Sequence, residues 1–205
     1  MRVKICGITN VDDALSAAEL GADALGFIFV KSSPRYIAPK TARKIIQELP
    51  PFVVPVGVFA DMAYNDILEI IDRTGIGCVQ LHGEETPKQL ANYPVPVYKS
   101  FRVDARFHPE ILRRYKGSAY LLDTKTPGAL GGTGQTFDWD GAIKAKEYGR
   151  IILAGGLNPE NIVKAARIVQ PYAADVNSGV EERPGKKDPA KLKLLFENLR
   201  QIKDI

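Results

Sequence analysis

The sequence predicts one α/β domain, spanning residues 1–205, that folds as a closed (β/α)8 barrel. Short apolar runs alternate eight times with segments of helical periodicity, a pattern typical of a parallel sheet. Many of these runs are apolar on both faces, as expected of strands that helices cover. The absence of a hairpin signal favours closure. The alternative is an open doubly wound sheet, but the first strand-to-helix turn lacks a GxGxxG fingerprint.

Four strand-and-helix units occupy the first half of the chain. Thr9 and Asn10 are favourable N-caps for the first helix, and Gly21 is a favourable C-cap. Pro39 and Pro87 suit the first turns of the second and fourth helices. The expected strands are residues 2–6, 24–29, 53–59 and 78–81, and the expected helices are residues 11–20, 39–49 and 64–73, with a short one from residue 86.

Four further units follow, and the loops after their last three strands contain glycine. A glycine-rich loop, 124–136, follows the sixth strand, and a basic loop after Ser178-Gly179 follows the eighth. The expected strands are residues 95–101, 119–123, 150–154 and 173–176, and the expected helices are residues 108–115, 139–147, 159–168 and 189–200.

The composition points to a small anionic substrate rather than a polymer or a membrane. The formal net charge is +4 and the pI is about 9.0, but the basic residues are dispersed, so nucleic acid is not expected as a partner. No apolar run approaches the roughly 20 residues of a membrane span. The chain begins directly with a strand, so no targeting peptide is expected.

The few cysteines and histidines limit the kinds of site that the chain can form. Cys6 and Cys78 lie at or near expected strands, which favours reduced thiols in a cytoplasmic protein. The two histidines are His82 and His108, and there is no CxxC or HExxH, so a protein-built metal site is not expected. His108 opens a helix and is expected to face solvent.

Several polar residues follow expected strands, where a barrel gathers its functional groups. Cys6 is a reactive thiol or a small buried hydrophobe. Arg35 binds a carboxylate through its fork or is an exposed loop residue. His82 orients a ligand or is a hydrogen-bonded strand end, and Asp123 is an acid or a loop anchor. These alternatives stay open on the residues alone.

The loops after the seventh and eighth strands indicate a phosphate site. Gly155-Gly156 and Ser178-Gly179 allow backbone N–H groups to approach an anion, and a helix N-terminus adds its dipole. Barrels often hold phosphate in these two loops. Lys186-Lys187, farther along the second loop, is expected to be solvated.

Seven segments, distributed in order over essentially the whole chain, match the pattern of one known family. They are Val3-Lys4-Ile5-Cys6-Gly7-Ile8-Thr9, Gly26-Phe27-Ile28-Phe29 with Ser33-Pro34-Arg35-Tyr36-Ile37, Val79-Gln80-Leu81-His82-Gly83, Leu121-Leu122-Asp123-Thr124, Gly131-Gly132-Thr133-Gly134 with Phe137-Asp138-Trp139, Ala154-Gly155-Gly156-Leu157-Asn158-Pro159, and Asp175-Val176-Asn177-Ser178-Gly179-Val180-Glu181 with Pro184-Gly185-Lys186-Lys187-Asp188. Through these segments the chain resembles the phosphoribosylanthranilate isomerase family of tryptophan biosynthesis.

The resemblance implies a single (β/α)8 TIM barrel without a cofactor, working as a monomer or homodimer. The implied reaction is an Amadori rearrangement of N-(5-phosphoribosyl)anthranilate to 1-(2-carboxyphenylamino)-1-deoxyribulose 5-phosphate. On the family pattern, Cys6 is the general base, Asp123 is the general acid, and Arg35 holds the anthranilate carboxylate. Further expected substrate contacts are His82 and Asp175, with the phosphate at Gly155, Gly156, Ser178 and Gly179. Asn177 departs from the pattern, because a small residue is expected there.

The implied roles set requirements on the environment of each group. Asp123 must hold a proton to act as an acid, and desolvation against apolar neighbours favours that form. Cys6 must become a thiolate, which a lowered pKa favours. Lys4 shares a strand face with Cys6, and the eighth strand neighbours the first in a closed barrel. We therefore expect a supporting Lys4–Asp175 ion pair below the site; the alternative is a Lys4 that points outward.

Other functions of a phosphate-binding barrel remain as alternatives. A metal-dependent epimerase needs converging histidines and carboxylates, and only His82 qualifies. A synthase similar to indole-glycerol-phosphate synthase needs a strand-end lysine and glutamates, which the sequence does not place convincingly. A flavin-binding barrel and a non-catalytic binder of phosphorylated ligands are the remaining candidates.

Overall fold

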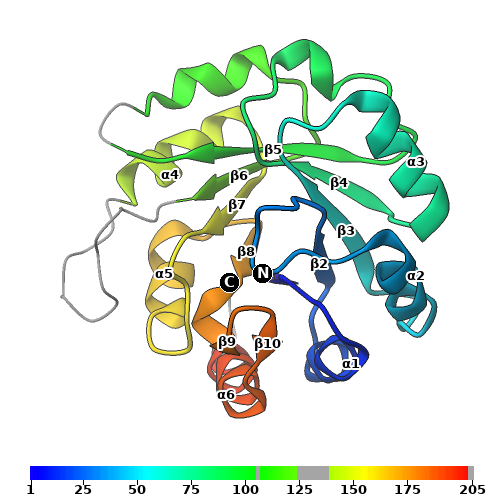
Figure 1. Cartoon of the computed structure of the whole chain (residues 1–205). Helices are drawn as coiled ribbons and strands as arrows, with labels where there is room; N and C mark the ends of the chain where they lie inside the picture. The colour runs from blue at the N-terminus through cyan, green and yellow to red at the C-terminus, as the bar shows by residue number, and fades with distance from the viewer. Residues whose placement is uncertain (105–106, 124–138, 203–205) are drawn as a thin grey trace.

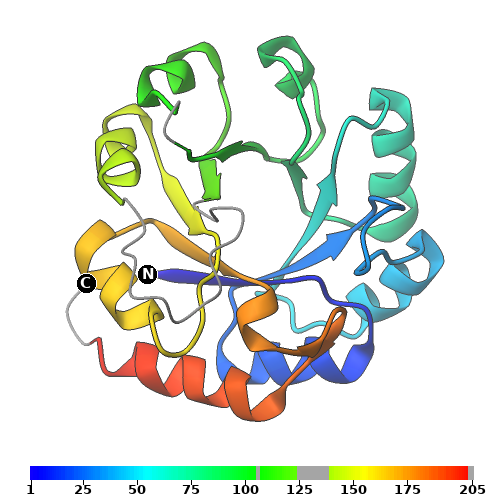
Figure 2. The same cartoon turned by 60° about the vertical axis from the view of Figure 1, so that its left-hand side comes forward.

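Eight parallel strands close into a barrel in sequence order, and helices surround it (Figures 1 and 2). The structure is a computed structural model that describes residues 1–104, 107–123 and 139–202. Every expected strand is present within one or two residues of its predicted bounds. The prediction of a closed (β/α)8 barrel is therefore confirmed, and the open doubly wound sheet is wrong.

The first half of the chain follows the expected alternation closely. The side chain of Asn10 accepts the N–H of Asp13 at the start of the first helix, and Gly21 ends that helix with a φ of 115°. The elements are β1 (Arg2–Cys6), α1 (Val11–Leu20), β2 (Ala24–Ile28), α2 (Pro39–Gln47), β3 (Val54–Phe59), α3 (Tyr64–Thr74), β4 (Cys78–Leu81) and η1 (Pro87–Leu90).

The departures from the expectation lie in the later helices, from residue 86 onward. The segments expected as helices from residue 86 and over 108–115 are the 3-10 helices η1 and η2, and the helix expected over 159–168 begins three residues later. The loop expected over 124–136 lies outside the described residues. The elements are β5 (Val97–Arg102), η2 (Pro109–Arg114), β6 (Tyr120–Asp123), α4 (Asp140–Ala145), η3 (Lys146–Tyr148), β7 (Ile151–Ala154), α5 (Ile162–Val169), β8 (Ala173–Val176), η4 (Ser178–Val180), β9 (Glu181–Arg183), β10 (Lys186–Lys187) and α6 (Pro189–Arg200).

A small antiparallel hairpin, β9 and β10, interrupts the last strand-to-helix connection. Lys186 pairs with Arg183 across it, outside the barrel sheet. Figure 1 shows the hairpin beside α6. The sequence was expected to contain no hairpin and to leave Lys186 and Lys187 in a solvated loop, and both expectations are wrong.

The barrel closes where β1 pairs with β8. The register places Lys4 opposite Asp175 and Ile5 opposite Val176. Because side chains alternate along a strand, Lys4 and Asp175 both point into the barrel. The first and last strands are thus joined by the backbone ladder and by interior side chains.

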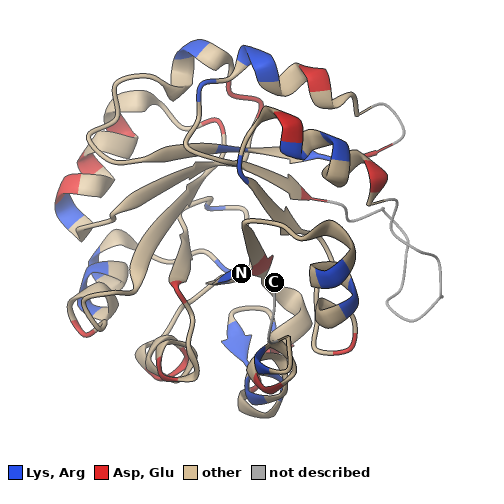
Figure 3. Cartoon of the chain, turned by 180° about the vertical axis from the view of Figure 1, so that it is seen from behind, with Lys and Arg blue, Asp and Glu red and all other residues tan. Residues whose placement is uncertain are grey.

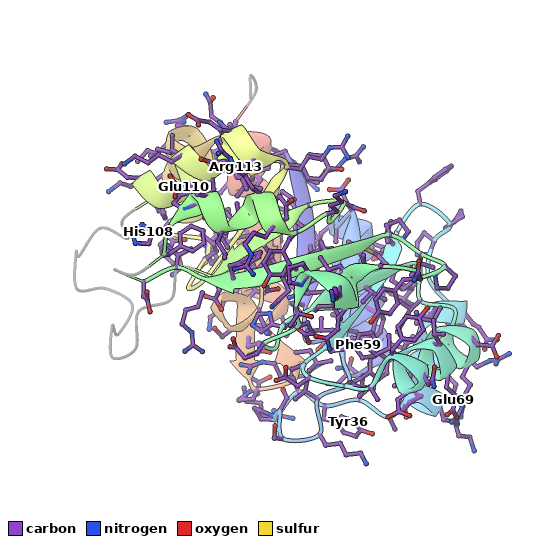
Figure 4. All side chains as sticks on the ribbon, turned by 90° about the horizontal axis from the view of Figure 1, so that it is seen from above. Tyr36, Phe59, Glu69, His108, Glu110 and Arg113 are labelled. Atoms are coloured by element: carbon purple, nitrogen blue, oxygen red, sulfur yellow. The ribbon has the colours of Figure 1, made fainter. Side chains whose placement is uncertain are left out.

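The apolar core of the described residues has three parts, the smallest being Cys6, Ile28 and Val58. The largest part fills the space between strands and helices, where Phe29 and Phe59 stack with ring centroids 5.3 Å apart. The second part lies inside the barrel and includes Val56, Tyr98 and Leu121. Figure 4 places Phe59 among packed side chains and Glu69 on the outer rim.

Charged residues lie mostly on the outer helices. Figure 3 shows basic and acidic residues interspersed over these helices, in agreement with the dispersed charge of the sequence. None of the described helices combines the length and apolarity needed to cross a membrane. The polar groups buried inside the barrel, including Lys4, Gln80 and Asp175, are therefore the exception that the site explains.

Candidate active site

A cavity of about 370 Å³ opens at the carboxyl ends of the strands. It gathers the predicted site residues from six different strand ends or loops. The predicted residues that line it are Cys6, Arg35, His82, Asp123, Gly155, Gly156, Asp175 and Ser178. Lys4 and Gly179, also predicted, lie behind this lining. Parallel strands bring these residues together because all their carboxyl ends meet at one rim.

The expected Lys4–Asp175 ion pair is present. Both carboxylate oxygens of Asp175 lie 2.9 Å from the Lys4 Nζ, and the two side chains are 5% and 8% exposed. Gly26 on β2 leaves space for this arrangement. A Cβ at Gly26 would lie 2.6 Å from the Cys6 Sγ and 3.0 Å from the Lys4 Cε. The Lys4 side chain therefore passes directly beneath Cys6 without obstruction from the neighbouring strand.

Cys6 is a buried thiol at the cavity floor. Burial raises the pKa of Cys6 above its ordinary value, the positive charge of Lys4 lowers it, and the charge of Asp175 raises it again. The net direction is upward, because burial outweighs the charge of Lys4. Burial lowers the pKa of Lys4, but Asp175 and Cys6 offset this, and the pKa lies well above its ordinary value. Lys4 thus stays charged beneath a neutral thiol.

Arg35 is held by Glu181 in a bidentate contact. Its Nε lies 2.9 and 3.1 Å from the Glu181 carboxylate oxygens, and its Nη2 lies 2.5 Å from one of them. The open-loop alternative for Arg35 is wrong, because its side chain is only 19% exposed. This contact uses one edge of the guanidinium. The other edge, with both Nη atoms, has the geometry to receive a second carboxylate, and Arg35 lines the cavity.

Glu181 also holds Lys187, which is almost fully buried. The Lys187 Nζ lies 3.0 Å from the Glu181 Oε1 and 3.2 Å from the Asn177 Oδ1, and the side chain is 1% exposed. Burial lowers the pKa of Lys187, although Glu181 opposes the shift. Burial raises the pKa of Glu181, but the hydrogen bond from Arg35 and the charge of Lys187 bring it below its ordinary value. Lys186, the neighbouring residue, binds Asp13 at 2.7 Å.

Sequence reasoning assigned no role to Glu181. The usable signal was the Pro184-Gly185 dipeptide between two charged pairs, which is typical of a turn and so of a hairpin. Because the hairpin folds back over the barrel rim, Glu181 and Lys187 reach the loop that carries Arg35. The site therefore contains a buried charge cluster that the strand pattern alone does not reveal.

His82, after β4, and Asp123, at the end of β6, both line the cavity. The ring Nδ1 of His82 lies 2.9 Å from the Gln80 Nε2. The backbone N–H of His82 donates to the Phe59 carbonyl at 2.7 Å. Desolvation lowers the pKa of His82, although the charges of Asp123 and Asp175 raise it. Both His82 and Asp123 also line a second cavity of about 350 Å³. His108, by contrast, is exposed at the start of η2 (Figure 4).

The loops after β7 and β8 touch each other. Gly155 and Gly156 have φ angles of 92° and 67°, which turn the backbone sharply at the end of β7. A Cβ at Gly179 would lie 1.9 Å from the Leu157 carbonyl oxygen. Gly179 is thus required for the two loops to meet, and their contact forms one glycine-lined wall of the cavity. Among the described residues, no three His, Cys, Asp or Glu side chains gather as a metal ion requires.

Comparisons with known proteins agree with this geometry. Residues 3–198 match the family model of N-(5'-phosphoribosyl)anthranilate isomerase. The enzyme of that name from Citrifermentans bemidjiense is 51% identical over 201 residues, with 98% of each chain covered. The crystal structure of phosphoribosyl anthranilate isomerase from Thermotoga maritima has a TM-score of 0.89 at 45% identity, covering 98% of this chain and all of that one.

Two further solved structures bear on ligand and assembly. One is an isomerase in complex with reduced 1-(o-carboxyphenylamino)-1-deoxyribulose 5-phosphate, at 41% identity, a TM-score of 0.87 and coverage of 98% of this chain and 100% of that chain. The other is described as monomers generated from the dimeric Thermotoga maritima isomerase, at 39% identity, a TM-score of 0.87 and the same coverage.

Proposed function

Because this chain belongs to the N-(5'-phosphoribosyl)anthranilate isomerase family, we propose that its cavity performs the isomerisation with Cys6 as base and Asp123 as acid. The chain is an isomerase of tryptophan biosynthesis, and its reaction is the Amadori rearrangement of N-(5-phosphoribosyl)anthranilate. The proposal concerns the roles of its residues. One observation carries it: Cys6 and Asp123 line the same cavity as Arg35 and the glycine-lined loops.

Asp123 opens the sugar ring in the first step. Its carboxylic acid donates a proton to the ring oxygen as the C1–O bond breaks, and the nitrogen lone pair forms a C=N bond to C1. The product is an open-chain protonated Schiff base. Asp123 is half-buried at the end of β6, beside the buried Leu122, and lines the cavity.

Cys6 removes a proton from C2 in the second step. The C2–H electrons form a C1=C2 bond, and the C=N electrons return to nitrogen, which gives an enolamine. The enolamine then loses the proton of its 2-hydroxyl group and gains one at C1, so the ketone forms. A thiol whose pKa is raised needs a cation nearby to act as a base, and Lys4 directly beneath Cys6 supplies it.

The ends of the substrate bind in separate loops. The outer edge of the Arg35 guanidinium takes the anthranilate carboxylate, while Glu181 fixes the inner edge. The phosphate binds the backbone of the loops at Gly155, Gly156, Ser178 and Gly179. His82 and Asp175 contact the sugar between them. Anchoring both ends places C2 near Cys6 and the ring oxygen near Asp123, and such positioning contributes strongly to the rate.

Turnover of freshly made phosphoribosylanthranilate, followed by its fluorescence decay, tests these roles. We expect Cys6→Ser and Asp123→Asn each to lower kcat by about 10²–10⁴-fold, with KM little changed. Cys78→Ser and Asp66→Asn are matched controls, because both residues lie outside the cavity lining. Near-normal kcat in either site variant would remove that residue from the mechanism.

Assembly and compartment are finer proposals. A homodimer is favoured by the dimeric Thermotoga maritima relative and by Phe52, which is 93% exposed next to Pro50 and Pro51. Sedimentation of the wild type and Phe52→Glu measures this, and a wild-type monomer would refute it. We also propose a cytoplasmic location, because a catalytic Cys6 has to remain reduced.

A further inference from the structure

A line of hydrogen bonds runs beneath His82 from the barrel interior. The Tyr98 hydroxyl group donates to the Gln80 Oε1 at 2.9 Å. The Gln80 Nε2 lies 2.9 Å from the His82 Nδ1 and donates to the Ser100 Oγ at 3.1 Å. Gln80 is 1% exposed and Tyr98 4% exposed, so water does not compete for these contacts. Every polar atom of the Gln80 amide group is therefore committed to a named partner.

Lys4 fixes the direction of this line. Burial raises the pKa of Tyr98 well above its ordinary value, with Lys4 acting in the opposite direction, so Tyr98 keeps its proton and remains a donor. The positive charge of Lys4 attracts the lone pairs of the Tyr98 oxygen and repels its proton. The proton therefore points to Gln80, which has to present its carbonyl oxygen to Tyr98 and its NH₂ group to His82.

An NH₂ group facing Nδ1 decides the state of the His82 ring. A neutral imidazole carries its proton on one nitrogen and accepts at the other. Because Nδ1 accepts from Gln80, the proton is on Nε2. Among the described residues, no protein group accepts a hydrogen bond from this Nε2. The ring lines the cavity, so its Nε2–H group is available to a ligand there.

We propose that Gln80 and Tyr98 are positioning residues that hold His82 as a neutral Nε2–H donor to an oxygen of the ribosyl chain. The proposal rests on the substrate site described above and assigns the chemistry of its His82 contact. In this state His82 cannot take a proton at Nε2, so it does not compete with Cys6 as a base. It stabilises the 2-hydroxyl oxygen, on which negative charge develops as that group loses its proton and the ketone forms.

The charges around His82 are consistent with a neutral ring. Asp123 and Asp175 favour the imidazolium, whereas desolvation and the charges of Lys4 and Lys99 oppose it, and the net effect lowers the pKa. Protonation would place a second N–H on Nδ1, directly against the Gln80 NH₂ group. To avoid this clash of two N–H groups, the Gln80 amide group would have to rotate by about half a turn. The Tyr98 proton would then lose its acceptor. The hydrogen bonds from Tyr98 through Gln80 and the surrounding charges therefore both favour the neutral His82 ring.

Nitrogen-15 NMR of histidine-labelled protein tests the proposal directly. The chain has two imidazoles, and a His108→Gln variant assigns them without touching the cavity. In the wild type we expect an unprotonated Nδ1 and a protonated Nε2 for His82 at neutral pH. In Gln80→Glu the carboxylate accepts from Nδ1–H, so the tautomer reverses or the ring becomes charged. A wild-type His82 with a protonated Nδ1 would overturn the proposal, whatever the activity of the protein.

Kinetics of three variants separate positioning from stability. Tyr98→Phe removes the donor that orients the Gln80 amide group, and we expect kcat/KM to fall roughly 10-fold, the effect of about one hydrogen bond. Ser100→Ala is the matched control, because it removes a Gln80 contact without changing the direction of the relay. Gln80→Glu should add an ionisation to the pH profile between about pH 5 and 8, where histidine titrates.

The outcomes distinguish this proposal from that of the acid and base. If Cys6→Ser and Asp123→Asn are inactive but His82 shows Nδ1–H, the relay is refuted and the acid–base roles stand. If His82 shows Nε2–H and Tyr98→Phe leaves tautomer and kcat/KM unchanged, Tyr98 has no positioning role. If Gln80→Glu keeps the wild-type tautomer and pH profile, Gln80 has no positioning role.

Discussion

Replacing Lys4 with Met should destabilise the fold strongly, because it leaves Asp175 charged and unpaired inside the barrel. Both side chains are less than a tenth exposed, and the Nζ lies 2.9 Å from each carboxylate oxygen. Removal of one partner of such a buried pair costs about 3–5 kcal/mol. The unbranched Met side chain follows the space of the Lys4 stem beside Gly26, so the loss measures the charge rather than a cavity.

Two further variants isolate the free-energy cost of the unpaired Asp175 charge. The double variant Lys4→Met/Asp175→Leu removes both charges, and we expect most of the lost stability to return, because apolar replacements of buried ion pairs are often neutral or stabilising. Arg73→Met breaks the exposed pair with Glu69, whose side chains are 56% and 63% exposed, and should cost at most about 1 kcal/mol. Urea unfolding measures all three. The reasoning fails if Lys4→Met costs no more than Arg73→Met, or if the double variant is no more stable than the single one.

The same variants report on the Cys6 thiol. Lys4 lowers the pKa of Cys6 and Asp175 raises it, so Lys4→Met should raise this pKa further and the double variant should bring it back toward the wild-type value. Rates of alkylation against pH, in a Cys78→Ser background, measure the shift. Burial already raises the pKa of Cys78 to about 11, and the background removes its slow reaction. An identical Cys6 profile in all variants would show that Lys4 does not support the thiolate.

Three other predictions concern the rim. Glu181→Gln should raise KM more than it lowers kcat, because Arg35 loses its carboxylate partner. Steady-state kinetics measure both constants, and a lower kcat with an unchanged KM would contradict this prediction. Gly179→Ala, whose Cβ would lie 1.9 Å from the Leu157 oxygen, should separate the phosphate loops and raise KM at least 10-fold, whereas an unchanged KM would exclude their role. The pKa of His82 is lowered in the folded protein, so its contribution to stability is complete above the unfolded pKa of about 6.5 and falls in acid. His82→Gln should therefore weaken the dependence of the urea midpoint on pH between about pH 7 and 5. A variant whose midpoint changes with pH as steeply as that of the wild type would contradict the shift.

The barrel was predictable because its signals are local and repeated. Each strand is a short apolar run, and each is followed by a helical or glycine-containing segment, so one alternation settles both topology and direction. The Lys4–Asp175 pair followed from two rules, side-chain alternation and closure of the first strand on the last. Nothing about the pair required knowledge of packing, and the structure confirms it.

The rim was less predictable because its contacts join distant loops. Thr9 was expected to cap α1, but its hydroxyl group donates to the Gly185 carbonyl, and Asn10 alone provides the cap. Lys187 has the composition of a solvated loop residue, yet the hairpin turns it inward against Glu181. Local propensity carries no information on which loop returns over which strand. The direction of the Cys6 shift could not be predicted either, because it depends on how burial balances the charge of Lys4.

The β1–β8 seam has a consequence for vectorial synthesis on the ribosome. Roughly 170 residues separate the two strands, which at about 5–20 residues per second take on the order of 10–30 s to translate. Through that interval one edge of β1 has no partner in the nascent chain. Charged residues on an open edge discourage pairing with other chains, and Arg2 and Lys4 lie on this strand. We therefore expect the charge of Lys4 to disfavour pairing of this edge with other chains before Lys4 meets Asp175.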